Sequence, residues 1–140
     1  PIAEHLLKQS KNTIMLSGGV IYREQNIILS PFENDVTRNF YAKRMFMGAQ
    51  GLCALGLMEA DPLIIQAEQK LINQSEELIV LADSSKFKAR TSLILCALER
   101  ITTIITDEGI RDEDRTMLDK AGVNLVVANE AAQSQQTGSG

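Results

Sequence analysis

The chain has 140 residues, of which 14 are lysine or arginine and 18 are aspartate or glutamate, giving a formal net charge of −4 at pH 7. Its 44% apolar and 23% charged residues are typical of one soluble globular domain, and they exclude a disordered or collagen-like chain. The negative charge and the 4% aromatic content also argue against nucleic-acid binding by this segment, because phosphate contacts need clustered cations and base stacking needs aromatic rings.

The cysteine and histidine content predicts neither a metal site nor a cofactor. His5 is the only histidine, and Cys53 and Cys96 lie too far apart in sequence for zinc-ligand spacing. We expect both cysteines to be small, buried apolar residues. The longest apolar runs, 78–82 and 93–97, are far shorter than the roughly 20 residues that span a bilayer, and no signal peptide is visible. We therefore expect a cytoplasmic protein with no membrane partner.

Short apolar runs alternate with helix-period segments along the chain, which is the pattern of β-α units on a mostly parallel sheet. Continuous Ile, Leu and Val runs are typical of strands that are covered on both faces. The predicted fold class is therefore α/β, with a mostly parallel sheet flanked by helices. The predicted strands are residues 13–16, 44–47, 78–82, 103–105 and 123–127.

The segment Ser30-Pro-Phe-Glu33 marks the start of a helix. It combines an N-cap hydroxyl, a proline at the first helical position and a glutamate three residues after the cap. This predicts a helix over residues 31–41. The residues before it, 20–22 and 26–29, predict a small hairpin or an extended excursion.

Two further helices follow later in the chain. Asp61 before Pro62 repeats the cap-and-proline signal and predicts a helix over residues 62–73. A third helix is predicted over residues 112–120 and should stop at Gly122, because glycine readily adopts the conformation that ends a helix.

Both ends of the sequence suggest a fragment. The chain begins with Pro1 in an amphipathic stretch that has nothing before it. Residues 128–140 are polar and small and show no periodicity, and their Gly-Ser-Gly end resembles a cloning residue. We expect one folded domain over residues 1–127 and a polar tail over residues 128–140.

Polar or glycine-rich segments follow four of the predicted strands. Open α/β sheets bind ligands at the carboxyl ends of their parallel strands, where glycines let backbone N–H groups approach an anion. Each segment alone is weak evidence, because glycine and aspartate are common in plain turns. Their convergence at one sheet edge predicts a binding site there. The segments are residues 17–19, 48–51, 83–86 and 106–109.

Glu68 lies within the apolar stripe of the second predicted helix. At about 100° per residue it falls between Ile64 and Ile72 on the helix surface. A buried carboxylate without a partner is costly, so Glu68 should reach the site edge, pair with a cation such as Lys86, or take up a proton. A structural ion pair that only anchors this helix to the loop after the next strand fits equally well.

Six segments of the sequence carry a family resemblance. They are MLSGGVIY at residues 15–22, FMGAQGL at 46–52, GLME at 56–59, the helix with Glu68 and Lys70, LADSSKF at 81–87 and IITD at 104–107. In this order they resemble the C-terminal effector-sensing domain of the DeoR family of bacterial transcriptional regulators. The resemblance covers nearly all of residues 1–127, and LADSSKF together with IITD is its most specific part.

The resemblance implies a fold like that of sugar-phosphate isomerases and coenzyme A transferases, here lacking the first strand-helix unit. It implies the sensing domain of a repressor of sugar catabolism, whose N-terminal helix-turn-helix domain, absent from this sequence, binds operator DNA. The expected effector is a phosphorylated sugar, with Lys86 as its anion contact. A missing unit would expose a sheet edge or an apolar face, so we also expect a homo-oligomer. The ligand-binding residues implied are Gly18, Gly19, Gly48, Gln50, Gly51, Glu68, Asp83 and Lys86, with no catalytic and no metal-binding residue.

Two positions depart from the family pattern, and two other functions stay open. Gln50 stands where the family commonly has aspartate, so a neutral amide would face the ligand, and Ser30 stands where glycine is common. One alternative is a sugar-phosphate isomerase-like or deaminase-like enzyme with Glu68 or Asp83 as the general base. The other is a pure oligomerisation domain in which the glycine loops are only turns.

Overall fold

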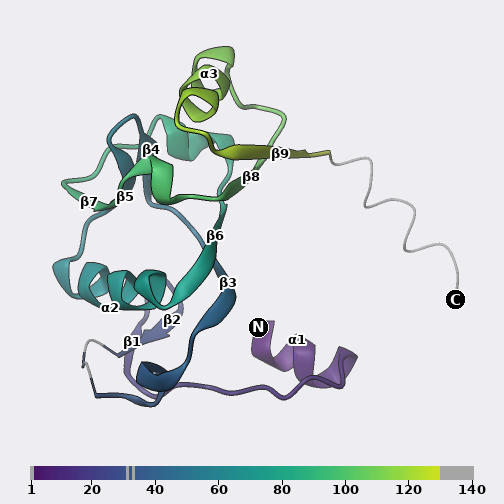
Figure 1. The fold of residues 1–140 in the computed structure, drawn as a ribbon, viewed down its shortest axis with the longest axis vertical. Coiled ribbons are helices and arrows are strands. Elements are labelled where there is room, and N and C mark those ends of the chain that lie inside the picture. Colours follow the sequence, from purple (N-terminus) through teal and green to yellow (C-terminus); the bar gives the residue numbers. More distant parts are fainter. Residues whose placement is uncertain (1, 31, 33, 130–140) are drawn as a thin grey trace, which may run out of the picture. The chain divides into compact units, whose positions relative to one another are not determined.

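The structure, a computed structural model, describes residues 2–30, 32 and 34–129. The chain divides into two compact units, Pro1–Phe40 and Tyr41–Gly140 (Figure 1). The second unit holds the parallel sheet and therefore most of the predicted site.

A helix and a short hairpin make up most of the regular structure of the first unit. The helix is α1 (Ile2–Gln9), and the hairpin pairs β1 (Val20–Tyr22) with β2 (Ile27–Leu29) in antiparallel fashion. The turn between the two strands contains Asn26 with a φ of 55°. This confirms the hairpin predicted for this part of the chain.

The strand predicted at residues 13–16 is wrong. These residues form no regular structure, and Met15 and Leu16 are exposed. The sheet of this unit contains only β1 and β2 within the described residues, so no neighbouring strand offers hydrogen-bond partners to residues 13–16.

The helix predicted over residues 31–41 is also wrong where the structure describes it; Pro31 and Glu33 lie outside the described residues. The segment contains only a single turn of 3-10 helix, η1 (Val36–Asn39). That turn starts at Asp35, whose carboxylate accepts a hydrogen bond from a backbone N–H at 2.8 Å, and extended backbone follows it at once. The helix start therefore lies later than the Ser-Pro signal predicts, and too few residues remain for an α-helix.

A four-stranded parallel sheet forms the centre of the second unit. Its spatial order is β3 (Ala42–Met47), β6 (Ser75–Leu81), β8 (Thr103–Asp107) and β9 (Asn124–Ala128). Every neighbouring pair in it is parallel, so the carboxyl ends of the strands lie at one edge. The four strands predicted in this part of the chain, and with them the α/β fold class, are confirmed.

A second, antiparallel sheet has no counterpart in the sequence prediction. In it β5 (Gly56–Glu59) lies between β4 (Gly51–Cys53) and β7 (Leu93–Cys96). The turn into β5 depends on Gly56, which has a φ of 137° and whose Cβ position lies 2.0 Å from the Cys96 carbonyl oxygen. Only glycine accepts both that conformation and that approach.

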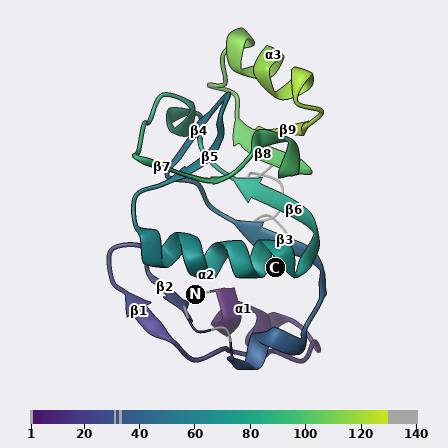
Figure 2. The same cartoon turned by 60° about the vertical axis from the view of Figure 1, so that its left-hand side comes forward.

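Two α-helices complete the second unit and confirm their predictions. They are α2 (Pro62–Asn73) and α3 (Asp112–Lys120). Asp61 caps α2 by accepting a hydrogen bond from a backbone N–H at 2.8 Å, and Gly122 follows the end of α3. Figures 1 and 2 show the helices at opposite sides of this unit, with α3 beyond β8 and β9. Within the described residues, no helix is both long and apolar enough to cross a membrane.

The core of the second unit lies against one face of the parallel sheet. Leu78, Val80 and Ile104 point to that face and are fully buried. Alternate residues point to the opposite face, where Phe46 is 59% and Leu81 is 46% exposed. The sheet of this unit therefore has one buried and one exposed apolar face, although the continuous apolar runs predict burial on both faces.

Candidate functional site

Three loops meet at the carboxyl edge of the parallel sheet. Residues 48–50 follow β3, and Asp83 with the 3-10 helix η2 (Ser84–Phe87) follows β6. The third loop begins at Asp107, the last residue of β8. Because β3, β6 and β8 are parallel neighbours, these loops lie side by side, as the sequence predicts for three of its four segments.

The Asp107 carboxylate ties two of these loops together. Its Oδ2 accepts a hydrogen bond from Ser84 N at 2.7 Å, and its Oδ1 accepts one from Gly109 N at 2.8 Å. Hydrogen bonds from Ser84, and then the one from Gly109, hold the pKa of Asp107 below its ordinary value. The ionised carboxylate thereby fixes η2 against the end of β8.

Asp83 organises η2 from its first residue. Its Oδ1 accepts hydrogen bonds from the Ser85 hydroxyl and from Ser85 N, the latter at 2.9 Å. These bonds lower the pKa of Asp83, and the nearby charge of Lys86 lowers it further. Asp83 is exposed and Lys86 is half-buried, so a carboxylate and an ammonium group stand on the same short turn.

The hydrogen bonds at this edge decide which ligand groups it can bind. Carboxylates already occupy the backbone N–H groups of Ser84, Ser85 and Gly109, so these groups do not form the anion cradle that the sequence predicts. The positive charge on η2 itself belongs to the Lys86 ammonium. The ionised Asp83 carboxylate is an acceptor suited to a ligand hydroxyl.

The loop after β3 places Gly48 and Gln50 at the same edge. Gly48 is exposed, with open space where a Cβ would stand, and Gln50 is half-buried. Gly51 differs, because it is buried in β4 and its Cβ position lies 2.8 Å from the Ala89 carbonyl oxygen. The close approach of the Ala89 backbone therefore explains why residue 51 is a glycine. No such contact explains the glycine at position 48, where the space for a Cβ is open.

Gly18 and Gly19 belong to the first unit, where both are exposed and precede β1. They do not follow a strand, because residues 13–16 form none. Their contact with a ligand stays a prediction.

Glu68, on α2, is influenced by a second carboxylate and not by a lysine. Its Oε2 is buried and has no hydrogen-bond partner among the described residues. Burial, and then the charge of Glu59, raises the pKa of Glu68 to about 7. The predicted ion pair with Lys86 is not found in the described part of the chain, and proton uptake is the predicted outcome that this environment favours.

Glu59 shapes the same region, although it is not among the site residues predicted from the sequence. It is the last residue of β5 and only 7% exposed. Its Oε1 accepts hydrogen bonds from Ala60 N at 2.7 Å and from Asp61 N at 3.4 Å. Its position directly before a helix start is the signal that could have identified it, because N–H groups there favour a carboxylate.

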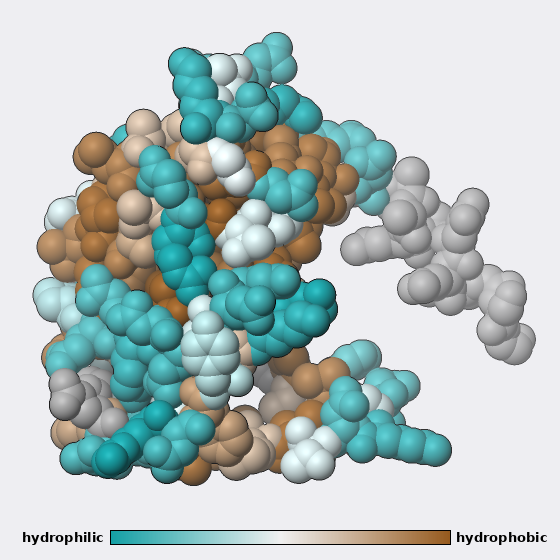
Figure 3. Space-filling view, in the orientation of Figure 1, coloured by the Kyte–Doolittle hydropathy of each residue, from teal (hydrophilic) through white to brown (hydrophobic). Residues whose placement is uncertain are grey.

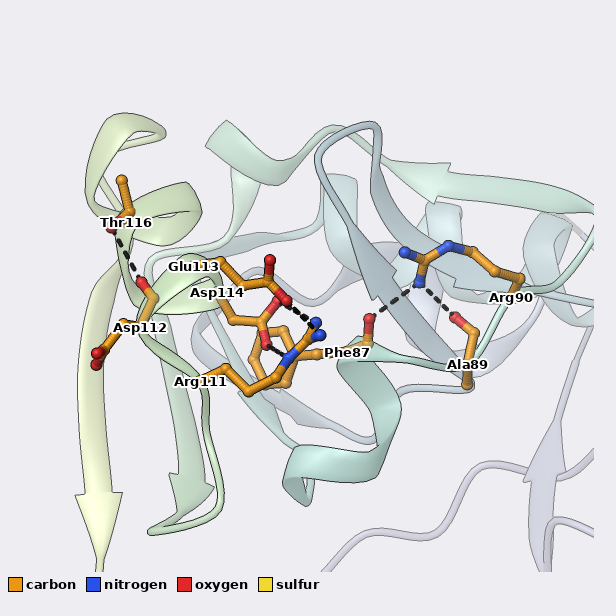
Figure 4. A network of polar contacts seen from close by, with 8 residues as sticks. All are labelled: Phe87, Ala89, Arg90, Arg111, Asp112, Glu113, Asp114 and Thr116. Carbon is orange, nitrogen blue, oxygen red and sulfur yellow. Dashed lines mark hydrogen bonds and ion pairs between the residues drawn. The ribbon is translucent and has the colours of Figure 1, made fainter.

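Two hollows lie beside α3. One, of about 370 Å³, has Arg90, Arg111 and Asp114 in its lining; the other, of about 590 Å³, lies between α3, the β4–β5 turn and the 3-10 helix η3 (Leu98–Arg100). In Figure 4 Arg111 turns toward Glu113 and Asp114, and Arg90 donates to two backbone carbonyls. None of the predicted site residues lines either hollow.

The two cysteines lie on neighbouring parts of the second unit, Cys53 at the end of β4 and Cys96 at the end of β7. Cys53 and Cys96 are free thiols, and both are partly buried where full burial is predicted. Burial raises the pKa of the Cys96 thiol, which keeps it protonated and weakly nucleophilic at neutral pH. Within the described ranges, no three or more His, Cys, Asp or Glu side chains form a group that could hold a metal ion.

Comparison with known proteins decides the family. The family described as the DeoR C terminal sensor domain matches residues 1–108. The chain belongs to this family. The resemblance carried by the LADSSKF and IITD segments is thereby confirmed, and the loops at the carboxyl edge of the sheet belong to a DeoR sensor domain.

Curated relatives of this sensor domain are longer proteins. The HTH-type transcriptional regulator UlaR of Shigella dysenteriae serotype 1 (strain Sd197) is 32% identical over 127 residues, which is 90% of this chain and 50% of that protein. The HTH-type transcriptional regulator UlaR of Escherichia coli O1:K1 / APEC shows the same identity over the same shares. The sensor domain thus spans about half the length of the curated relatives it matches.

Proposed function

We propose that this sensor domain binds a phosphorylated sugar and belongs to a bacterial repressor of sugar catabolism. Its relatives are HTH-type transcriptional regulators of which this chain covers only half. This supports a helix-turn-helix domain, outside the sequence given, as the part that binds operator DNA. The effector would then act by shifting the population between DNA-bound and DNA-released forms.

The turn that carries Asp83 and Lys86 is the observation on which the proposal rests. It offers one cation and one ionised hydrogen-bond acceptor, and the Asp107 carboxylate holds it in place with a hydrogen bond of 2.7 Å. A phosphorylated sugar has the matching groups, a phosphate for Lys86 and hydroxyls for Asp83. A carboxylate beside the cation also disfavours a bare anion, so sugar and phosphate are both required.

The remaining predicted contacts surround this pair in the proposal. Gly48 and the Gln50 amide come from the neighbouring loop of the same edge. Glu68 contributes as a carboxyl that is partly protonated near neutral pH, which weakens its repulsion of a phosphate. Gly51 acts by letting β4 pack closely, and Gly18 and Gly19 are proposed contacts from the first unit.

One observation favours a second candidate, an enzyme of the sugar-phosphate isomerase or deaminase type. The pKa of Glu68 is raised to about 7, and a general base works best when its pKa lies near the working pH. In that case Glu68→Gln would abolish turnover of a phosphorylated sugar. The sensor proposal expects no turnover by the unaltered chain.

A thermal-shift screen of phosphorylated sugars and their unphosphorylated counterparts tests the proposal. A ligand at about a hundred times its dissociation constant should stabilise the fold by roughly 2.7 kcal/mol. We expect shifts with phosphorylated sugars only. Stabilisation by the free sugars alone, or by none of the compounds, would contradict the proposal.

Lys86→Ala measures the proposed anion contact, and Lys88→Ala is its matched control. Lys88 is exposed and stands two residues further along the same turn. Loss of a charge-assisted hydrogen bond costs about 1.5–3 kcal/mol, so calorimetry should show affinity falling by roughly 10-fold to 100-fold for Lys86→Ala. Unchanged affinity in Lys86→Ala, or an equal loss in Lys88→Ala, would count against the assigned contact.

A further inference from the structure

The smaller hollow beside α3, of about 370 Å³, combines an apolar part with a charged part. Pockets that hold small organic molecules begin at about this volume, and they are usually apolar with a few polar groups. Figure 3 shows charged side chains of α3 bordering an apolar area of the second unit. The lining of the hollow divides in the same way, with apolar surface from Ala54 and Phe87 and charges from Arg90, Arg111, Glu113 and Asp114.

Asp114 holds the Arg111 guanidinium at this hollow. Asp114 is only 6% exposed, and its two carboxylate oxygens accept hydrogen bonds from Arg111 Nε at 2.8 Å and Nη2 at 3.1 Å. Pairing through two parallel hydrogen bonds fixes the orientation of a guanidinium group. The third nitrogen, Nη1, forms an ion pair with Glu113, whose side chain is 65% exposed. The hollow therefore already holds a surface carboxylate, on an arginine that a buried carboxylate keeps in place.

Arg90 brings a second guanidinium group to the same hollow. Its Nη1 donates hydrogen bonds of 3.0 Å to the carbonyl oxygens of Phe87 and Ala89, which uses both N–H bonds of that nitrogen. Nε and Nη2 have no hydrogen-bond partner within the described part of the chain, so three of the five N–H donors of this arginine remain for a ligand or for water. Figure 4 shows that Arg90 and Arg111 approach Phe87 from different elements.

We infer that this hollow binds a small organic monocarboxylate with an apolar body, in a site separate from the one proposed on η2. The ligand carboxylate contacts the free donors of Arg90 and replaces the Glu113 carboxylate on Arg111. The apolar body lies against Phe87 and Ala54, which line the same hollow.

The charges of the lining select this class of ligand. Asp114 neutralises Arg111, so the charge of Arg90 is the one left over when Glu113 turns toward solvent. A single carboxylate balances that charge, whereas an ion such as phosphate brings excess negative charge next to Asp114. Glu113 can leave at little cost, because an exposed ion pair contributes little to stability.

An NMR titration of the full chain with benzoate tests the site. At constant ionic strength, the Nε–H signals of Arg90 and Arg111 and the amide signal of Phe87 should shift and reach saturation. Benzamide has the same ring without the charge, and inorganic phosphate has charge without an apolar body. Neither should give saturable shifts at these signals. Equal shifts with either compound, or none with benzoate, would overturn the inference.

Two substitutions with opposite expected effects identify the carboxylate contacts. Arg90→Ala should raise the dissociation constant of benzoate about tenfold or more, because a charge-assisted hydrogen bond is lost. Glu113→Gln should lower it about twofold to fivefold, because the carboxylate that competes for Arg111 is removed. A gain in affinity cannot result from misfolding, and circular dichroism checks the fold of Arg90→Ala.

The matched controls are Arg115→Ala and Asp112→Asn. Both residues are exposed on α3, and neither lines the hollow. Each control removes the same charge as its counterpart, so its effect on the affinity for benzoate should be clearly smaller. Equal effects of a control and its counterpart would show that general electrostatics is responsible. That result would overturn the inference, as would unchanged affinity in Arg90→Ala.

Two further variants separate this site from the edge that carries η2. Ala54→Leu fills the apolar part of the hollow and should weaken benzoate binding about tenfold, whereas Leu55→Ala, at the exposed neighbouring position, should not. Equal effects of these two would count against the assigned apolar contact. Loss of benzoate binding in Lys86→Ala would place the carboxylate on η2 and overturn the inference. A failure of phosphorylated sugars to bind refutes the proposed sensor function and leaves this site untouched.

Discussion

Replacing Glu68 by glutamine should stabilise the fold in a way that depends on pH. The pKa of Glu68 rises from 4.5 to about 7, chiefly because the carboxyl is buried and then because of the charge of Glu59. A carboxyl with a raised pKa binds its proton more tightly in the folded state than in the unfolded state. The unaltered protein should therefore lose stability as the pH rises from about 4.5 to about 7, and above this range the loss is complete.

The size of the effect follows from that shift. A rise of about 2.5 units corresponds to roughly 3.4 kcal/mol as an upper limit. Glu68 is only partly buried, so solvent screening reduces the expected gain for Glu68→Gln to about 1–2 kcal/mol at alkaline pH. Near pH 4 the gain should vanish, because a protonated glutamate and a glutamine are both neutral and similar in size.

Urea unfolding followed by circular dichroism, at several values between about pH 4 and about pH 8, measures this difference. Glu76→Gln removes a charge from an exposed position on β6 and is the matched control. An equal gain for Glu68→Gln at both ends of the pH range would show that shape and not ionisation is responsible. No gain at alkaline pH would refute the raised pKa.

Three further substitutions probe the frame that holds the site. Gly56→Ala should destabilise the fold by about 3 kcal/mol or more, because its φ of 137° and the carbonyl 2.0 Å from its Cβ position exclude a side chain; near-normal urea stability would contradict this. Asp107→Asn should leave the fold intact but speed hydrogen exchange of the Ser84 amide, measured by NMR, because the ionised acceptor at 2.7 Å is lost. Unchanged exchange would show that η2 keeps its structure without the Asp107 carboxylate. Arg100→Ala removes hydrogen bonds of 2.8 and 2.7 Å to two backbone carbonyls at the α2–β6 junction and should cost about 1–3 kcal/mol in urea unfolding, whereas a neutral result would mean that water replaces the arginine.

Elements specified by neighbouring residues could be predicted from the sequence. The cap at Asp61 and the stop at Gly122 set the bounds of α2 and α3, because capping depends on residues within one turn. The strands of the parallel sheet follow from their apolar runs. The same local rules fail at Ser30, where a helix signal precedes only a single 3-10 turn, η1.

The antiparallel sheet could not be predicted because its pairing is not local. β4 and β5 have only three and four residues, and β5 finds its second partner in β7, more than thirty residues further along the chain. Glycines at both strand starts also resemble turn signals. Such short segments are strands only because their partners and the core are present.

In the candidate site, too, the features set by neighbouring residues could be predicted, and those set by tertiary contacts could not. The positions of Asp83 and Lys86 follow from a strand end, and the unusual place of Glu68 follows from helix geometry alone. What the sequence could not reveal is how the donors are used. The carboxylates of Asp83 and Asp107 take the backbone N–H groups of Ser84, Ser85 and Gly109, so the proposed anion contact at this turn is a side chain, Lys86.

Two carboxyl groups of the second unit have pKa values shifted in opposite directions, lowered for Asp83 and raised for Glu68. An enzyme uses such a pair when both groups act on one substrate, whereas a sensor needs only the groups that hold its ligand. The two carboxyls stand on different elements, η2 and α2, and the charge that perturbs Glu68 comes from Glu59 and not from η2. In the proposal Asp83 and Lys86 are therefore the main contacts to the ligand, and the burial of Glu68 on α2 is enough to explain why its pKa is raised. A binding constant that falls far less for Glu68→Gln than for Lys86→Ala is the result that the sensor proposal expects.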